Sequence, residues 1–320
     1  MFTPHPIVSD RPPWRSLLRI ALNVGLGFLI VGPLLGFAVT SAFYNGNLLA
    51  DLERAVAKPG LVNAALLMQG IVTFVGLIIF PLVHLLRLEQ KPLDPFFPPK
   101  ENLTASLLIV AGIGLTFPIA ISPLAEWNLN FQFPELLKGF EDWALKEEER
   151  LARLTALITD FDTTAGLLIG ILVIALLPAI GEELVFRGMI QHELWRASKN
   201  PHVAIWVSGI IFSAIHLQFY GFVPRMLLGV LFGYLYFWSG NLLLPMFSHF
   251  LNNAFAVVMV YLNNIGVSDI NIEDGEAMHW TQVIPSLIIT TGLIYYFWKH
   301  HSIARPSTTP QDDSFDEPGL

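Results

Sequence analysis

The sequence predicts an all-α protein that crosses a membrane several times, and three observations support this prediction. Hydrophobic residues make up 53% of the 320 residues, and charged residues make up only 14%. A soluble domain carries about 25% charged residues, and the mean hydropathy of this chain is +0.56. The apolar residues also form long runs, which can cross a hydrocarbon core of ~30 Å as helices rising ~1.5 Å per residue.

Eight apolar runs are expected to be the membrane spans. The first run follows basic residues, as a signal peptide does, but it is far longer than the ~7–15 residues of a signal-peptide core, so we expect it to be retained. In chain order the runs are Leu17–Phe43, Leu61–Leu86, Leu103–Ala125, Thr163–Gly181, Val203–Phe219, Phe222–Trp238, Leu242–Leu262 and Trp280–Trp298.

These runs divide the chain into three parts. Residues 16–299 form the predicted transmembrane helical domain, and residues 1–15 form a cytoplasmic N-terminal segment. The polar, acidic and proline-containing residues 300–320 are expected to form a disordered cytoplasmic tail.

The Lys and Arg residues in the connections predict the orientation. With the N-terminus inside, the inner segments hold eleven of these residues and the outer segments seven. Four of the seven lie in one long acidic connection, and long loops count for little. We therefore expect a plasma-membrane protein, in a bacterial inner membrane, with both termini in the cytoplasm.

The charge and the cysteine content exclude several kinds of binding partner and catalytic site. The net charge of −8 comes largely from loops and the tail, so it indicates no nucleic-acid partner. The chain has no cysteine, which excludes disulfides, thiolate metal sites and a cysteine nucleophile.

The long outer connection, residues 126–162, is expected to contain an amphipathic helix. Its apolar residues recur at a spacing of three to four, and Glu147 to Arg150 make a charged face. Such a helix can rest on the membrane surface, cover the helical bundle or only connect two spans. The sequence leaves these alternatives open.

The fourth run leads into two carboxylates and an arginine, at its predicted cytoplasmic end. Because Glu183 and Arg187 are four residues apart, they share one helix face and can form an ion pair. Glu182 is rotated by about 100° and has no partner at helical spacing, which suits a general base. The alternative is that the helix simply leaves the membrane here, although ionisable residues inside a membrane are usually functional.

Two later helices carry polar residues at depth. The fifth contains His216, and the seventh contains His249 and Asn253, which share a face. Each of these residues alone could be a packed or helix-linking residue. Together with a carboxylate they could activate water and stabilise an oxyanion, and two histidines with one glutamate could also bind zinc.

Two other catalytic patterns are excluded. The segment from His192 to Arg196 lacks the second histidine that a zincin helix needs at its last position. No Gly-x-Ser-x-Gly elbow surrounds an intramembrane serine.

The order of these motifs resembles the CAAX protease and bacteriocin-processing family, also called CPBP or Abi. The resemblance rests on Glu182-Glu-x-x-x-Arg187, Phe212-x-x-x-His216 and His249-x-x-x-Asn253 on three helices. It covers residues 163–262, the matched catalytic core. The family implies an intramembrane protease whose site lies in a conical cavity between the fourth, fifth and seventh helices and opens to the cytoplasm.

The resemblance also implies roles for the residues. Glu182 would activate water with the help of His216, while His249 and Asn253 would stabilise the oxyanion. Glu183 and Arg187 would form the ion pair that fixes the helix, although Arg187 could instead meet a substrate carboxylate.

Two features of the site stay open in the sequence. With zinc bound, Glu182, His216 and His249 would be the ligands and Glu183 the base; a metal-independent glutamate mechanism fits the same residues. Phe212 is expected to pack beside His216.

The implied partners are the lipid bilayer and a membrane protein or peptide substrate, with lipidated proteins among the candidates. The alternative is a non-catalytic scaffold or bacteriocin-immunity protein, or a proton-coupled transporter that uses the same buried groups as a relay. Transporters often show repeated halves, whereas the polar residues here crowd into one half of the chain.

Overall fold

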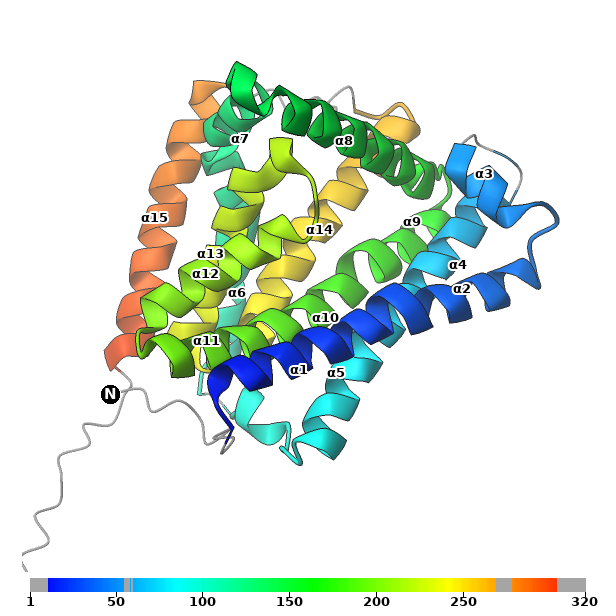
Figure 1. Cartoon of the computed structure of the whole chain (residues 1–320). Coiled ribbons are helices and arrows are strands. Elements are labelled where there is room, and N and C mark those ends of the chain that lie inside the picture. Colours follow the sequence, from blue (N-terminus) through cyan, green and yellow to red (C-terminus); the bar gives the residue numbers. More distant parts are fainter. Residues whose placement is uncertain (1–10, 55–57, 59, 100, 269–277, 304–320) are drawn as a thin grey trace, which may run out of the picture.

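The computed structural model describes residues 11–54, 58, 60–99, 101–268 and 278–303, and within these ranges the chain is helical (Figure 1). The prediction of an all-α polytopic membrane protein is confirmed. Six helices are long and apolar enough to cross a membrane: Pro13–Ser41, Leu61–Leu88, Leu103–Ala120, Thr164–Ser198, Phe219–Ser239 and Leu243–Asn264. The predicted fifth and eighth spans are also helical, as Pro201–Ala214 and Trp280–Ile303. The count of eight stays a prediction.

Three of the long helices contain π-helical segments. The label η marks these segments (η1, η2, η3, η6 and η7) and also the short 3₁₀-helices of the connections (η4, η5 and η8). The first consists of α1 (Pro13–Gly25), η1 (Leu26–Val31) and α2 (Gly32–Ser41). The second consists of α4 (Leu61–Thr73), η2 (Phe74–Ile79), α5 (Phe80–Val83) and η3 (His84–Leu88). The third consists of α9 (Thr164–Gly170), η6 (Ile171–Leu176), α10 (Leu177–Val185), η7 (Phe186–Ile190) and α11 (Gln191–Ser198).

The remaining predicted spans are α-helices without a π-helical segment. They are α6 (Leu103–Ala120), α12 (Pro201–Ala214), α13 (Phe222–Ser239), α14 (Leu243–Asn264) and α15 (Trp280–Ile303). Asn200 caps α12, since its side chain accepts from the backbone N–H groups of His202 and Val203 and Pro201 follows. Lys199 and Gly240, in left-handed conformations, end α11 and α13.

Shorter helices lie in the connections. They are α3 (Leu48–Arg54), η4 (Asp94–Phe96), α7 (Ser122–Leu129), η5 (Glu135–Leu137), α8 (Lys138–Thr159) and η8 (Phe219–Gly221). The amphipathic helix predicted in residues 126–162 is therefore present as α8. It lies across the end of the bundle opposite to that at which α1 begins and α15 ends (Figure 1), and it contacts α4, α14 and η8.

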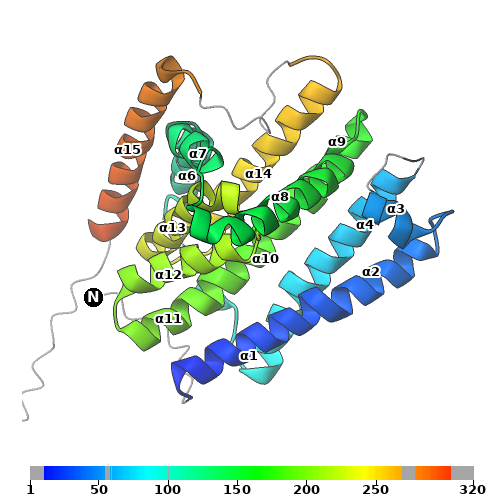
Figure 2. The same ribbon diagram turned by 45° about the horizontal axis from the view of Figure 1, so that its top comes forward.

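Glycine residues allow the helices to approach closely. A Cβ atom on Gly181 would lie 2.6 Å from the Leu77 Cβ atom and 3.0 Å from the Leu77 carbonyl oxygen. Where α12 lies beside α13 (Figure 2), a Cβ atom on Gly229 would lie 3.1 Å from the Cα atom of Gly209. Small residues serve this purpose in membrane bundles because apolar burial does not drive association there.

The end of the bundle at which α1 begins is held by ionic contacts. Arg11 forms an ion pair with Glu89, and Arg196 forms one with Glu193. Arg196 also donates to the backbone oxygen of Arg11 at 3.0 Å. Glu193 of the apparent zincin motif is therefore a structural residue.

Two helices extend past the predicted terminal boundaries within the described residues, and the boundaries themselves stay predictions. The helix α1 begins at Pro13, inside the segment predicted as N-terminal, and α15 continues to Ile303, inside the predicted tail. The last turns of α15 pack against α6, because His301 is buried and its Nε2 atom lies 3.5 Å from Ser106 Oγ of α6. The rest of the predicted tail, 304–320, and residues 1–10 lie outside the described residues.

Candidate active site

The fourth membrane helix carries the two glutamates near its middle. It runs without interruption for 35 residues, from Thr164 to Ser198, and the position of Glu182 and Glu183 toward its cytoplasmic end stays a prediction. The polar residues that follow them do not leave the bundle, since Gln191 and Glu193 are buried. Both glutamates therefore lie on a helix that stays packed in the bundle on either side of them.

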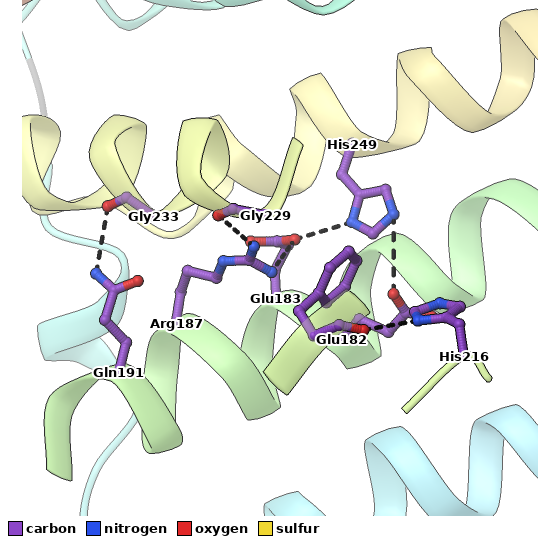
Figure 3. A network of polar contacts seen from close by, with 9 residues as sticks. Glu182, Glu183, Arg187, Gln191, His216, Gly229, Gly233 and His249 are labelled. Carbon is purple, nitrogen blue, oxygen red and sulfur yellow. Dashed lines mark hydrogen bonds and ion pairs between the residues drawn. The ribbon is translucent and has the colours of Figure 1, made fainter. Parts of the chain in front are cut away.

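Glu183 and Arg187 form a fully buried ion pair. Arg187 Nη1 donates to Glu183 Oε1 at 2.8 Å, and neither side chain has exposed surface. Arg187 Nη2 donates to the backbone oxygen of Gly229, on α13, at 2.7 Å. The ion pair predicted from the four-residue spacing is thus confirmed, and it also links α10 and η7 to α13 (Figure 3).

Aromatic rings enclose the guanidinium group of Arg187. Its central carbon lies 4.9 Å from the ring centroid of Phe212, 5.5 Å from that of Phe232 and 5.9 Å from that of Phe186. Ring faces attract cations, and the delocalised guanidinium suits such a site. Because this enclosure leaves Arg187 without exposed surface, the alternative in which it meets a substrate carboxylate is not supported.

His249 of α14 lies between the two glutamates (Figure 3). Its Nδ1 atom lies 2.8 Å from Glu183 Oε1, and its Nε2 atom lies 3.9 Å from Glu182 Oε2. Because an ionised carboxylate only accepts, Nδ1 carries a hydrogen and donates to Glu183. The imidazole also stacks on Phe232, with centroids 4.8 Å apart and planes 17° apart, so its orientation is fixed by both contacts.

His216 lies just beyond the end of α12. Its Nδ1 atom is 2.7 Å from the backbone oxygen of Phe212. A carbonyl only accepts, so Nδ1 donates and Nε2 is left to act as an acceptor when the ring is neutral. The ring centroid of Phe212 lies 5.1 Å from that of His216 and 6.0 Å from that of His249. Phe212 therefore packs between the two imidazoles.

Glu182 differs from its neighbour in both burial and partners. Its side chain is 15% exposed, whereas that of Glu183 is fully buried. Within the described part of the chain, no hydrogen bond to the Glu182 carboxylate is formed, and its ion-pair contact is the 3.9 Å approach to His249. The two adjacent carboxylates therefore have different surroundings, as the rotation of about 100° between them predicts.

The side chain of Asn253 contacts its neighbour in the sequence, and its role at an oxyanion stays a prediction. Its Oδ1 atom accepts from Asn252 Nδ2 at 3.1 Å. The structure thus brings Glu182, Glu183, Arg187, His216 and His249 into one neighbourhood, while Asn253 lies one helical turn beyond His249 on the same helix.

A cavity of about 740 Å³ reaches His216. It lies between η1, α3, α4 and α8. Its lining is mostly apolar, and its arginines come only from α8. The lining includes Arg150, Arg153, Leu154, His216 and Gln218. The conical cavity expected between the fourth, fifth and seventh helices stays a prediction.

Sequence reasoning missed the contribution of α13. Arg187 and Gln191, one turn apart, donate to the backbone oxygens of Gly229 and Gly233, also one turn apart, at 2.7 and 3.2 Å. The signal was the Gly229-x-x-x-Gly233 spacing in an apolar helix, which allows a neighbouring helix to approach closely.

The residues proposed as zinc ligands do not form a metal site in their present positions. Among the described residues, no three His, Cys, Asp or Glu side chains are grouped so that they could hold a metal ion.

Comparison with known proteins matches the same part of the chain. Residues 164–255 match a family model described as type II CAAX prenyl endopeptidase Rce1-like. An uncharacterized protein, YpbD, of Bacillus subtilis (strain 168) is 33% identical over 88 residues, which are 26% of this chain and 42% of that protein. The membrane-embedded CAAX protease MroQ of Staphylococcus aureus (strain USA300) is 35% identical over 96 residues, 28% of this chain and 38% of that protein. The chain thus spans less than half the length of these curated relatives. No solved structure matches it.

Proposed function

We propose that this chain, whose residues 164–255 match the Rce1-like family model and whose motifs resemble those of the CAAX protease and bacteriocin-processing family, is an intramembrane endopeptidase. The substrate is a membrane protein or a peptide that reaches the apolar cavity below α8, and lipidated proteins are included in this class. The reaction is hydrolysis of one peptide bond by a water molecule that Glu182 activates.

The observation that carries the proposal is the difference between the two glutamates. Glu183 is committed to Arg187 and His249, so it is not free to exchange protons with a substrate. Glu182 is partly exposed and lies beside His249 without a hydrogen bond. A positioned carboxylate of this kind can act as a general base, which contributes typically 10²–10⁴-fold to a rate.

The proposed reaction uses both imidazoles. Glu182 takes a proton from water, with His216 Nε2 as a second acceptor, and the water oxygen bonds to the substrate carbonyl carbon. The carbonyl oxygen becomes an oxyanion, which His249 stabilises from Nε2 when both of its nitrogens carry hydrogen. The carbon–nitrogen bond then breaks, and Glu182 returns the proton to the leaving amine. Removing one oxyanion donor typically costs ~2.7–4 kcal/mol.

The test compares wild-type protein, Glu182→Gln and a matched control in a cleavage assay on purified protein with candidate tail peptides. Glu182→Gln is expected to abolish cleavage and to leave the protein folded in detergent, because it removes the base without leaving a cavity. Glu149→Gln, on the exposed face of α8, is the control and should cleave like the wild type. Near-wild-type turnover by Glu182→Gln would show that the assignment is wrong.

A further inference from the structure

The backbone directly after His216 adopts an unusual conformation. Leu217 has a φ angle of +57°, in the left-handed region that residues other than glycine rarely occupy. This conformation is unfavourable for a residue with a side chain, so the surrounding structure must hold it. Such conformations often occur at functional sites.

Gln218, the next residue, is held from two other helices. Arg225 of α13 donates to the Gln218 side-chain oxygen at 2.8 Å and to its backbone oxygen at 3.4 Å. Gln218 Nε2 in turn donates to Glu148 Oε1, on α8, at 3.4 Å. The second oxygen of Glu148 accepts from the backbone N–H of Tyr220, also at 3.4 Å. One carboxylate of α8 therefore contacts the segment that follows His216 at two points.

Aromatic packing brings α8 to the same segment. The ring of Phe219 lies 4.8 Å from that of Phe140 and 5.6 Å from that of Trp143, both on α8. Asn128 of α7 holds the same segment from another direction. Its Nδ2 donates to the backbone oxygen of Phe219 at 3.0 Å, and its Oδ1 accepts from the backbone N–H of Val223 at 2.7 Å.

The same helix also covers the cavity at which His216 lies. Arg150, Arg153 and Leu154 of α8 line this cavity together with His216 and Gln218. A substrate that enters the cavity must therefore contact the helix whose Glu148 holds the segment next to His216.

We propose that Glu148 is a positioning residue for His216: it acts through Gln218, so that the site is complete only while α8 is docked on the segment Leu217–Tyr220. This inference rests on the proposed function, because it assigns His216 a role in the reaction. It gives α8 a role beyond that of a connector, and it makes the contact between substrate and α8 a means of controlling the site.

The experiment compares Glu148→Ala, Glu148→Gln and Glu149→Ala. Glu149 is the matched control, since it lies one residue further along α8 with a side chain 72% exposed. Glu148→Ala should lower kcat by about tenfold or more with little change in KM, as expected when a proton-transferring group is displaced. Glu148→Gln keeps an oxygen that can accept from Gln218 or Tyr220, and it should recover most of the loss.

A second measurement does not depend on turnover. The ring signals of His216, followed by NMR against pH in ring-labelled protein, should titrate at a different midpoint in Glu148→Ala and at the wild-type midpoint in Glu149→Ala. Equal midpoints and equal kcat values in the two alanine variants would overturn the positioning role. If the wild-type protein cleaves no peptide, the proposed function fails, and the His216 titration still decides whether Glu148 sets the surroundings of that ring.

Discussion

The Nδ1 atom of His249 lies 2.8 Å from Glu183 Oε1, the same oxygen that accepts from Arg187 Nη1 at 2.8 Å. One buried carboxylate oxygen thus joins a structural cation to an imidazole of the candidate site. A substitution that breaks the ion pair should therefore lower the stability of the fold and also displace the His249 ring.

The first prediction concerns Arg187. Replacing it with alanine strands the buried carboxylate of Glu183, and breaking a buried pair in this way costs ~3–5 kcal/mol. Arg187→Ala should express poorly and unfold at a lower temperature in detergent. Arg153→Ala, which breaks an exposed pair with Glu149, is the control and should change stability by ~0–1 kcal/mol. The double variant Glu183→Gln/Arg187→Gln should recover some yield. A stable but inactive Arg187→Ala protein would contradict the structural role.

The second prediction separates the two adjacent glutamates by stability alone. Glu183→Gln removes the charge that balances fully buried Arg187, so its unfolding temperature should fall. Glu182→Gln changes a carboxylate that is 15% exposed and accepts no hydrogen bond among the described residues. No buried cation loses its counter-charge in this variant, so its unfolding temperature should fall less. Thermal unfolding of both variants in the same detergent measures the difference. Equal losses in the two variants would mean that the division of roles is wrong.

The third prediction concerns the contact between α12 and α13. In Gly209→Ala, the new Cβ atom would lie 2.8 Å from Val230 Cγ2 and 3.1 Å from the backbone oxygen of Met226. Overpacking of this kind costs ~1–3 kcal/mol, and the displaced α13 would carry the Gly229 carbonyl away from Arg187. The control is Gly292→Ala, also within a helix, whose Cβ atom would meet no atom within 4 Å. Unfolding temperatures should fall for Gly209→Ala and stay equal or rise for Gly292→Ala. An unchanged Gly209→Ala protein would argue against close packing here.

The fourth prediction concerns pH and the docking of α8. Burial raises the pKa of Glu148, and the opposing effects of the Tyr220 backbone N–H, Arg225 and Gln218 do not cancel this rise. Docked Glu148 therefore binds a proton more tightly than the exposed carboxylate of an undocked helix. Docking should strengthen as pH falls through the raised pKa and weaken at higher pH.

Spin labels can measure this docking, because the chain has no cysteine of its own. Labels on Leu145→Cys and Val203→Cys, both exposed positions, should show a larger population at long distance at about pH 8 than at about pH 5. Glu148→Gln serves as the control and should remove the pH dependence. A distance distribution that is independent of pH in the wild-type background would contradict the prediction.

The fifth prediction concerns metal. We propose that the site works without obligatory zinc, since Glu182, His216 and His249 are not grouped as ligands among the described residues. Protein washed with a chelator should keep its activity without stoichiometric zinc. Zinc that is bound stoichiometrically, lost together with activity and restored with it would show that this proposal is wrong.

Sequence reasoning could predict the contacts that depend on spacing within one helix. The Glu183–Arg187 pair follows from a separation of four residues, and α8 follows from the apolar periodicity of residues 138–159. The apolar run of the fourth helix ends at Gly181, whereas the helix itself continues to Ser198. Charged residues end an apolar run even where a neighbouring helix supplies their hydrogen-bond partners. Gly229 provides that partner for Arg187, and no property of the fourth helix alone reveals it.

The surroundings of His216 could not be predicted for a related reason. Its position depends on Leu217, whose left-handed conformation has no sequence signal, and on Gln218, whose partners lie on α8 and α13. The docking of an amphipathic helix is a tertiary contact, and periodicity shows only that the helix has an apolar face.

The position of α8, at the end of the bundle away from the start of α1 and the end of α15, also bears on the fate of the products (Figure 1). Under the proposed function, the compartment that faces α8 supplies the attacking water and receives the severed fragment. With the termini inside the cell, as the loop charges favour, the fragment is released outside the cell. With the opposite orientation it is released into the cytoplasm.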